Sequence, residues 1–123
     1  MENQVKVLGF LNDEEVSDLY QGSVGFIYPS LIEGFGFQGL EAIASGTLLL
    51  ASDISVFREI YGDNAIYFDP NNSNSISDAI KKVLEIQPSE RLRIITRGQK
   101  FIKKYSWEKT AKEALKAYES FKW

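Results

Sequence analysis

Two glutamates flank a glycine-rich stretch in the first half of the chain, and residues of these types at this spacing can bind a polar ligand. Glu33 precedes the stretch 34–39, which contains three glycines, and Glu41 follows it. Glycines let the backbone approach a ligand closely. A helix that begins among them offers unpaired N–H groups and a positive dipole end, which suit a diphosphate. Because each carboxylate oxygen accepts more than one hydrogen bond, Glu33 and Glu41 suit hydroxyl groups on either side of that diphosphate.

The same stretch also matches the pattern G-x-G-x-x-G of dinucleotide-binding folds. Asp53 lies 19 residues after Gly34, close to where such a fold holds the acid that binds the ribose. Two features weigh against this interpretation. Residues 29–33 separate the preceding strand from the first glycine, and Glu33 would place a carboxylate beside the pyrophosphate. A fragment of an NAD-binding Rossmann dehydrogenase therefore stays as the alternative.

The segments around the stretch alternate between strand-like and helix-like patterns. Short apolar runs predict four strands, at residues 5–10, 23–28, 48–51 and 65–68. A helix is expected after Asn12, which has Glu15 three residues on, and another is expected to end at Gly46. A short helix is expected at residues 56–61, stopped at Gly62. A regular apolar stripe at residues 76–84 predicts a longer helix, and two more helices finish the chain.

Strands that alternate with helices at this spacing predict an α/β fold, a Rossmann-like parallel sheet flanked by helices. Ligands of such open sheets bind outside the carboxyl ends of the strands. The run from Tyr28 to Glu41 directly follows one expected strand. The fold therefore places the glycine-rich stretch where a ligand would bind.

Composition excludes several kinds of chemistry. The 123 residues include no cysteine and no histidine, which removes disulfides, thiolate metal sites, histidine bases and the usual zinc sites. Residues 90–123 carry ten Lys/Arg and four Asp/Glu, a balance of +6, whereas the rest of the chain carries −9. We interpret this basic end as the solvated face of amphipathic helices and expect no nucleic-acid partner. No apolar run approaches the roughly 20 residues that span a bilayer.

A family resemblance becomes specific between Glu33 and Gly46. The sequence EGFGFQGLEAIASG there resembles the signature of glycosyltransferase family 4, the retaining GT-B enzymes. The flanking segments agree, in order, over nearly the whole chain: VLGFLNDEE from Val7, YPS from Tyr28, ASD from Ala51, REI from Arg58, GDNA from Gly62, YFDP from Tyr67 and YSW from Tyr105. Gln38 and Leu48 depart from it, since the family often has proline at both positions.

The resemblance implies a role for each residue that matches the signature. Glu33 is expected to be the catalytic residue, in contact with the donor sugar near the reacting carbon. Glu41 is expected to hold the ribose. The backbone N–H groups of the loop are expected to bind sugar and diphosphate, and they belong to Gly34, Phe35, Gly36, Phe37 and Gln38. A segment before the first helix is expected to border the base, and it consists of Gly9, Phe10 and Leu11. Neither a metal nor another cofactor is expected.

The implied reaction transfers a hexose from a nucleotide-diphosphate sugar, with UDP expected as the nucleotide, to an acceptor hydroxyl with retention. The expected setting is bacterial surface polysaccharide synthesis (O-antigen, capsule or lipopolysaccharide), in the cytoplasm or at the inner face of the membrane. In this family a sugar or lipid-linked acceptor binds a separate N-terminal lobe. An Arg and a Lys of the donor site lie in an earlier strand–loop–helix. We therefore expect residues 1–123 to form part of the donor lobe and to be inactive alone. A non-catalytic nucleotide-sensing module and an inert scaffold are the remaining alternatives.

For other side chains we expect packing or ion pairs rather than contact with a ligand. Phe35 and Phe37 are expected mainly to pack, and Arg58 to form a salt bridge with a nearby acid. The last helix carries Trp107, Ala111, Ala114, Leu115, Tyr118 and Phe121 on one side. With Trp123, these residues predict exposed apolar surface and self-association of the isolated chain. In the full-length protein, the basic charge nearby could support peripheral contact with an anionic membrane.

Overall fold

The computed structural model describes residues 4–121 and contains the expected parallel sheet. Its three strands are β1 (Phe26–Tyr28), β2 (Leu49–Ser52) and β3 (Ala65–Phe68), in the order β1-β2-β3. Both pairs are parallel. The bounds of β3 are those expected from the sequence, and β1 occupies the end of its expected run.

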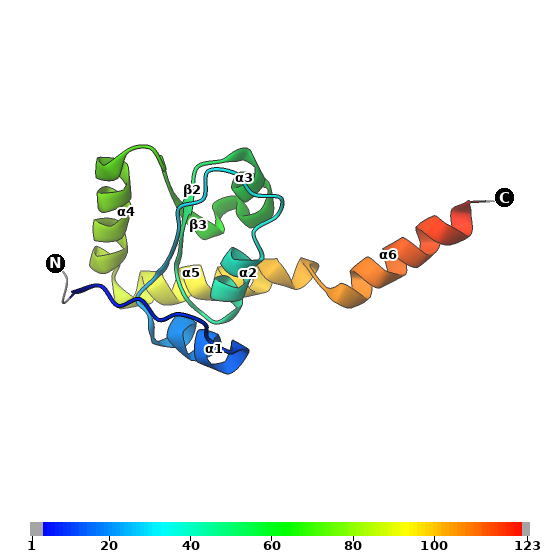
Figure 1. Ribbon diagram of the computed structural model, residues 1–123, viewed down its shortest axis with the longest axis horizontal. Helices are drawn as coiled ribbons and strands as arrows, with labels where there is room; N and C mark the ends of the chain where they lie inside the picture. Colours follow the sequence, from blue (N-terminus) through cyan, green and yellow to red (C-terminus); the bar gives the residue numbers. More distant parts are fainter. Residues whose placement is uncertain (1–3, 122–123) are drawn as a thin grey trace.

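Helices connect the strands and cover both faces of the sheet (Figure 1). The helices of residues 4–121 are α1 (Asp13–Gly22), α2 (Phe37–Ala44), α3 (Ser55–Tyr61), α4 (Ser73–Glu85), α5 (Pro88–Phe101) and α6 (Trp107–Ser120), with short 3₁₀ turns η2 (Gly62–Asn64) and η3 (Ile102–Lys104); of these, α2 and α3 lie between strands in the chain. The capping box expected at the start of α1 is formed, since Asn12 and Glu15 exchange side-chain hydrogen bonds with each other's backbone N–H.

The core has two parts because β2 is buried on both faces, which explains its unbroken apolar sequence. On one face, Leu49 and Ala51 pack in a cluster with residues of α2 and α3, among them Ile43, Phe57, Ile60 and Tyr61. On the other face, Leu48 and Leu50 pack with Phe68 of β3 and with Ala79 and Val83 of α4. The two clusters fix α2 and α3 on one side of the sheet and α4 on the other.

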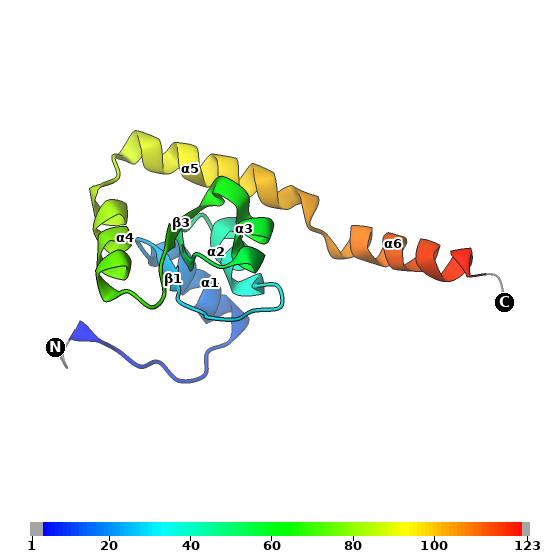
Figure 2. The same ribbon diagram turned by 90° about the horizontal axis from the view of Figure 1, so that it is seen from above.

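Helix α5 runs across the edge of the sheet at which the strands begin (Figure 2). Its side chains reach the backbone just before each strand. Arg91 donates to the carbonyl of Val24 at 2.6 Å, ahead of β1, and Gln99 donates to the carbonyl of Ala44 at 3.1 Å, ahead of β2. Arg97 donates to the carbonyl of Asp63, ahead of β3. This edge is closed, so the opposite edge, where the strands end, is the one open to a ligand.

The strand expected at residues 5–10 is not formed, and this prediction was wrong. The described part of the chain has three strands where four were expected, and Val7 and Phe10 are 91% and 97% exposed. An alternating apolar pattern shows that a segment can pair, but a strand exists only if a neighbour supplies the hydrogen bonds. Residues 5–10 lie as an extended segment that pairs with none of the three strands.

Helix α6 extends away from the body of the molecule, as both views show (Figures 1 and 2). Trp107, Tyr118 and Phe121 are 77%, 78% and 71% exposed, so the apolar side expected from the sequence faces solvent. Self-association through this side stays a prediction, and Trp123 lies outside the described residues. No helix within residues 4–121 is long and apolar enough to cross a membrane.

Candidate functional site

The glycine-rich stretch spans the junction between a loop and α2. Strand β1 ends at Tyr28, a loop follows, and α2 begins at Phe37. Gly36 is the N-cap of α2, with φ of 96° in the left-handed region, and no side chain caps the helix there. Within residues 4–121, no side-chain hydrogen bond uses the N–H of Phe37 or Gln38 at the carboxyl edge of the sheet, whereas the Gly39 N–H is directed at the Tyr61 hydroxyl. This arrangement suits an anionic group.

Glu33 is held from the side of the sheet by two hydroxyl groups. The Tyr28 hydroxyl lies 3.0 Å from Glu33 Oε1, and the Ser30 hydroxyl lies 2.9 Å from the same oxygen. Within residues 4–121, no hydrogen bond uses Glu33 Oε2. One carboxylate oxygen is thus fixed by the protein, and the other can accept a hydrogen bond from a ligand.

Tyr61 lies beneath the loop and explains two of its three glycines. This side chain is fully buried, and its hydroxyl donates to the carbonyl of Gly36 at 2.6 Å. A Cβ at Gly36 or at Gly39 would overlap that hydroxyl, whereas a Cβ at Gly34 would meet nothing within 4 Å. Gly36 and Gly39 are therefore needed for packing on Tyr61, and the match to G-x-G-x-x-G has a structural cause.

The Tyr61 hydrogen bond also sets the direction of a backbone N–H. In a planar trans peptide the C=O and the following N–H point in opposite directions. Since Tyr61 holds the Gly36 carbonyl toward the core, the N–H of Phe37 points away from it. The first N–H of α2 is thus turned toward the outer side of the loop, where a ligand would lie.

The two tyrosines stay protonated at neutral pH and can act as donors. Burial raises the pKa of Tyr28 to about 12, and the adjacent Glu33 carboxylate adds to this effect. Burial also raises the pKa of Tyr61. The rings are connected through Phe57, with centroids 4.7 Å from Tyr28 and 5.1 Å from Tyr61. A packed row of aromatic rings thus supports both ends of the loop.

Glu41 lies on the outer side of α2 and lines a groove of about 1000 Å³ between α2 and the start of α6. Phe37 and Glu41 are four residues apart, so they share one side of the helix. The Phe37 ring stacks on Trp107, with centroids 5.8 Å apart, and Phe35 packs edge-on against Tyr105. Phe35 packs against the core, as expected, whereas Phe37 stacks on Trp107 but stays 51% exposed, so the core role expected for it is not observed. The two glutamates point to different places: Glu33 lies against Tyr28, and Glu41 faces this groove.

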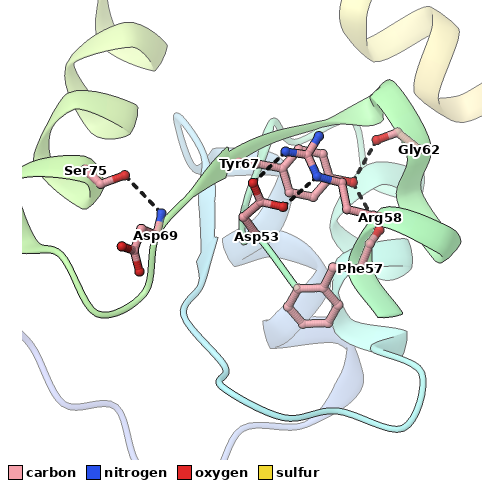
Figure 3. A network of polar contacts seen from close by, with 7 residues as sticks. All are labelled: Asp53, Phe57, Arg58, Gly62, Tyr67, Asp69 and Ser75. Carbon is pink, nitrogen blue, oxygen red and sulfur yellow. Dashed lines mark hydrogen bonds and ion pairs between the residues drawn. The ribbon is translucent and has the colours of Figure 1, made fainter. Parts of the chain in front are cut away.

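Asp53 is engaged in a two-pronged ion pair with Arg58 (Figure 3). Arg58 Nε and Nη2 donate to the two carboxylate oxygens of Asp53 at 2.6 and 2.7 Å. The guanidinium also lies 3.8 Å from the ring centroid of Tyr67, whose hydroxyl lies within hydrogen-bonding distance of one backbone carbonyl of α3 and one of η2. The hydrogen bond from Arg58 lowers the pKa of Asp53. The expected Arg58 salt bridge is confirmed, and both carboxylate oxygens of Asp53 accept a hydrogen bond from Arg58.

A variant of Asp53 tests this assignment. Asp53→Asn is expected to lower the urea midpoint of unfolding only slightly, because exposed ion pairs contribute little, and to leave nucleotide binding unchanged. Since the Asp53 pKa is lowered in the folded state, the stability difference should be present above pH about 4 and vanish as the pH falls through that lowered pKa. Urea unfolding from pH 2 to 7 checks the trend. Loss of nucleotide binding in this variant would instead place Asp53 in the nucleotide site.

The segment expected to border the base is not joined to the loop. Gly9, Phe10 and Leu11 lie in the extended segment before α1, and none of the hydrogen bonds within residues 4–121 connects them to residues 33–41. No group of three or more Asp, Glu, His or Cys side chains in the described part of the chain could hold a metal ion.

The expected site residues did not include the side chains that support the loop, although Tyr28 and Ser30 belong to the segment YPS that carries part of the family resemblance. Tyr28, Ser30 and Tyr61 have no part in the binding pattern, yet each forms a hydrogen bond with a loop residue. One signal was available for Tyr28: it shares a face of β1 with Phe26 and directly precedes the loop. The contact from Tyr61 spans 25 residues, and no local pattern indicates it.

The fold and the loop together define a Rossmann-like α/β unit of the kind that forms the C-terminal part of GT-B glycosyltransferases. The chain belongs to the family described as glycosyl transferases group 1, whose model matches residues 1–101. This membership confirms the resemblance found in the sequence and removes the basis for the dehydrogenase alternative.

Several curated relatives are named as mannosyltransferases of bacteria. The chain is 34% identical to O-antigen chain mannosyltransferase B of Escherichia coli over 95% of its own length and 30% of that enzyme. It is 31% identical to the O-antigen chain mannosyltransferase RfbU of Salmonella typhimurium, over 88% of the chain and 29% of the enzyme. It is 32% identical to the serotype-specific mannosyltransferase WbdA of Escherichia coli, over 94% of the chain and 14% of the enzyme. The chain thus spans less than a third of the length of each of these relatives.

Proposed function

We propose that this chain is the donor-binding part of a glycosyltransferase that transfers a hexose from a nucleotide-diphosphate sugar to an acceptor hydroxyl with retention of configuration. The observation that carries the proposal is the uncapped start of α2 at the carboxyl edge of the sheet, with Glu33 before it and Glu41 one turn after it. Family membership supplies the reaction class.

Each part of the donor has a complementary group in this arrangement. The diphosphate accepts hydrogen bonds from backbone N–H groups of residues 34–38, among them that of Phe37, whose direction Tyr61 helps to set. The free oxygen of Glu33 accepts a hydrogen bond from a sugar hydroxyl near the reacting carbon. Glu41, one turn along α2, accepts hydrogen bonds from the ribose hydroxyls. The base lies by residues 9–11, which must approach the loop in the complete site.

The leaving diphosphate needs positive potential, and we propose that no metal supplies it. The dipole of α2 provides part of this potential. The residues 4–121 place no lysine or arginine among the side chains that bond to the loop. Basic side chains from the remainder of the longer protein would provide the rest, which is why we expect no turnover by residues 1–123 alone.

The relatives' names guide the choice of sugar and setting. Three are named for mannosyl transfer, and two of these for the O-antigen chain. We therefore propose a mannose-type hexose as the transferred sugar and surface polysaccharide synthesis as the setting, with a sugar or lipid-linked acceptor held by the N-terminal lobe. Such an enzyme would work in the cytoplasm, at the inner face of the membrane when its acceptor is lipid-linked.

A panel of nucleotides tests the donor class and identifies the base. Calorimetric titration with UDP, GDP, ADP, NAD, UDP-glucose and GDP-mannose should show one nucleoside diphosphate binding better than the others. The sequence-based expectation is UDP. If the guanosine ligands bind better, the base assignment changes while the donor site stands. Binding of NAD alone would contradict the proposal.

A further inference from the structure

The Tyr28 hydroxyl lies between two side chains of the loop. It is 3.0 Å from Glu33 Oε1 and 2.8 Å from the Oε1 of Gln38. Glu33 lies before the glycines of the loop, and Gln38 lies in the first turn of α2. One hydroxyl therefore connects the two sides of the loop in which the donor is proposed to bind.

A hydroxyl has one proton, so Tyr28 can donate to only one of these neighbours. The carboxylate is the stronger acceptor because hydrogen bonds to an ionised group are shorter and stronger than neutral ones. An amide turned by 180° occupies the same volume, so Gln38 can present its NH₂ group to the Tyr28 oxygen instead. The consistent arrangement runs from the Gln38 amide to the Tyr28 hydroxyl and from that hydroxyl to Glu33.

Tyr28 is itself fixed and can hold its neighbours in place. Its ring packs 4.7 Å from that of Phe57 and 5.6 Å from that of Phe26. It ends β1, and Pro29, with a fixed φ, follows it. Glu33, by contrast, lies on a loop, and holding a free glutamate in one orientation costs side-chain entropy. Two hydroxyl groups on one oxygen reduce that cost before a ligand arrives.

The hydrogen bond between Tyr28 and Gln38 depends on a residue at which this sequence departs from the family pattern. The family resembled by residues 33–46 often has proline at this position, and proline has no side-chain hydrogen-bonding group. The amide of Gln38 adds a partner for Tyr28 that a proline could not supply. Glu33 is therefore connected through Tyr28 to a side chain of α2.

We propose that Tyr28 and Gln38 are positioning residues that hold Glu33 with one oxygen engaged and the other directed at the donor sugar. The inference rests on the proposed function, because it takes Glu33 as the group that contacts the sugar. The side chains of Tyr28 and Gln38 act through Glu33 and touch no reacting atom themselves.

The first test needs no ligand. With ¹³C-labelled glutamate, the Cδ resonance of Glu33 at neutral pH should shift and broaden in Tyr28→Phe, because the carboxylate loses one of its two hydroxyl partners. Tyr67→Phe is the matched control: it removes a half-buried tyrosine hydroxyl whose partners are backbone carbonyls away from Glu33. An unchanged Glu33 resonance in Tyr28→Phe would overturn the proposal.

The second test separates positioning from general loss of structure. Tyr28→Phe should weaken binding of the preferred nucleotide-sugar about tenfold, the size expected for a lost hydrogen bond to a charged group, and leave the nucleoside diphosphate unaffected. Gln38→Met should cause a smaller loss in the same direction. In a Glu33→Gln background, Tyr28→Phe should have no further effect, because its contribution passes through Glu33.

The outcomes distinguish this inference from the proposed function. Equal weakening of nucleotide-sugar and nucleoside diphosphate in Tyr28→Phe would assign Tyr28 a merely structural role and overturn the inference, while the donor site stands. If the wild-type chain and the longer protein bind none of the nucleotides, the proposed function fails. The Glu33 resonance then still decides whether Tyr28 fixes this carboxylate.

Discussion

Gly36→Ala is expected to lower the free energy of unfolding by about 2–5 kcal/mol, whereas Gly34→Ala is expected to change it by no more than about 0.5 kcal/mol. The two glycines are two residues apart in the same loop. They differ in what surrounds them. Comparing the two variants therefore shows whether the loop needs glycine for packing on Tyr61 or only for backbone flexibility.

Two effects act together at Gly36. Its φ of 96° is one that a residue with a Cβ rarely adopts, and an added Cβ would overlap the Tyr61 hydroxyl and lie 2.7 Å from Phe57 Cε1. Tyr61 and Phe57 are both fully buried, so neither ring can move aside without disturbing the core. At Gly34 neither effect is present.

Urea unfolding followed by circular dichroism measures both variants against the wild-type chain. Gly39→Ala should resemble Gly36→Ala, because its Cβ would overlap the same tyrosine hydroxyl and lie 2.8 Å from a ring carbon. Equal effects at Gly34 and Gly36, whether both large or both small, would show that Tyr61 does not support the loop from below.

Glu41→Ala is expected to weaken binding of the nucleoside diphosphate and of the nucleotide-sugar by the same factor. The expected loss of affinity is about 10- to 100-fold, the range for hydrogen bonds to a charged group. The reason is that Glu41 is proposed to hold the ribose, which both ligands contain. Glu33→Gln is expected to weaken only the nucleotide-sugar, because Glu33 is proposed to hold the sugar.

Calorimetry with the preferred ligand pair measures these losses, and Glu59→Ala on the outer side of α3 serves as the control. Glu59 is an exposed glutamate like Glu41, but it lies on a different helix and lines neither the loop nor the groove beside α2. If Glu33→Gln weakened binding of both ligands equally, Glu33 would not contact the sugar alone, and the proposed roles of the two glutamates would be wrong.

The elements that sequence predicted well are those fixed by neighbours along the chain. The capping box at Asn12, the stop of α3 at Gly62 and the bounds of β3 all depend on residues within a few positions. The paired carboxylates around the glycines were found in the same way, and the structure places Glu33 in the loop before α2 and Glu41 one turn along that helix.

The elements that sequence could not predict depend on distant partners. The apolar pattern of residues 5–10 is that of a strand, but no pattern states whether a neighbouring strand exists. The glycines match a nucleotide-binding pattern, yet the requirement for Gly36 comes from Tyr61, 25 residues away. The closure of one sheet edge by Arg91, Arg97 and Gln99 likewise depends on contacts across more than 30 residues.

The central claim is that the start of α2 binds the diphosphate of a nucleotide. Titration of the ¹⁵N-labelled chain with the preferred nucleoside diphosphate, followed by backbone amide NMR, tests it most directly. The account predicts saturable shifts at residues 34–38 and 41, with Phe37 among the largest, and their loss in Glu41→Ala. Saturable binding whose shifts lie elsewhere, with the amides of residues 34–38 unmoved, would contradict it.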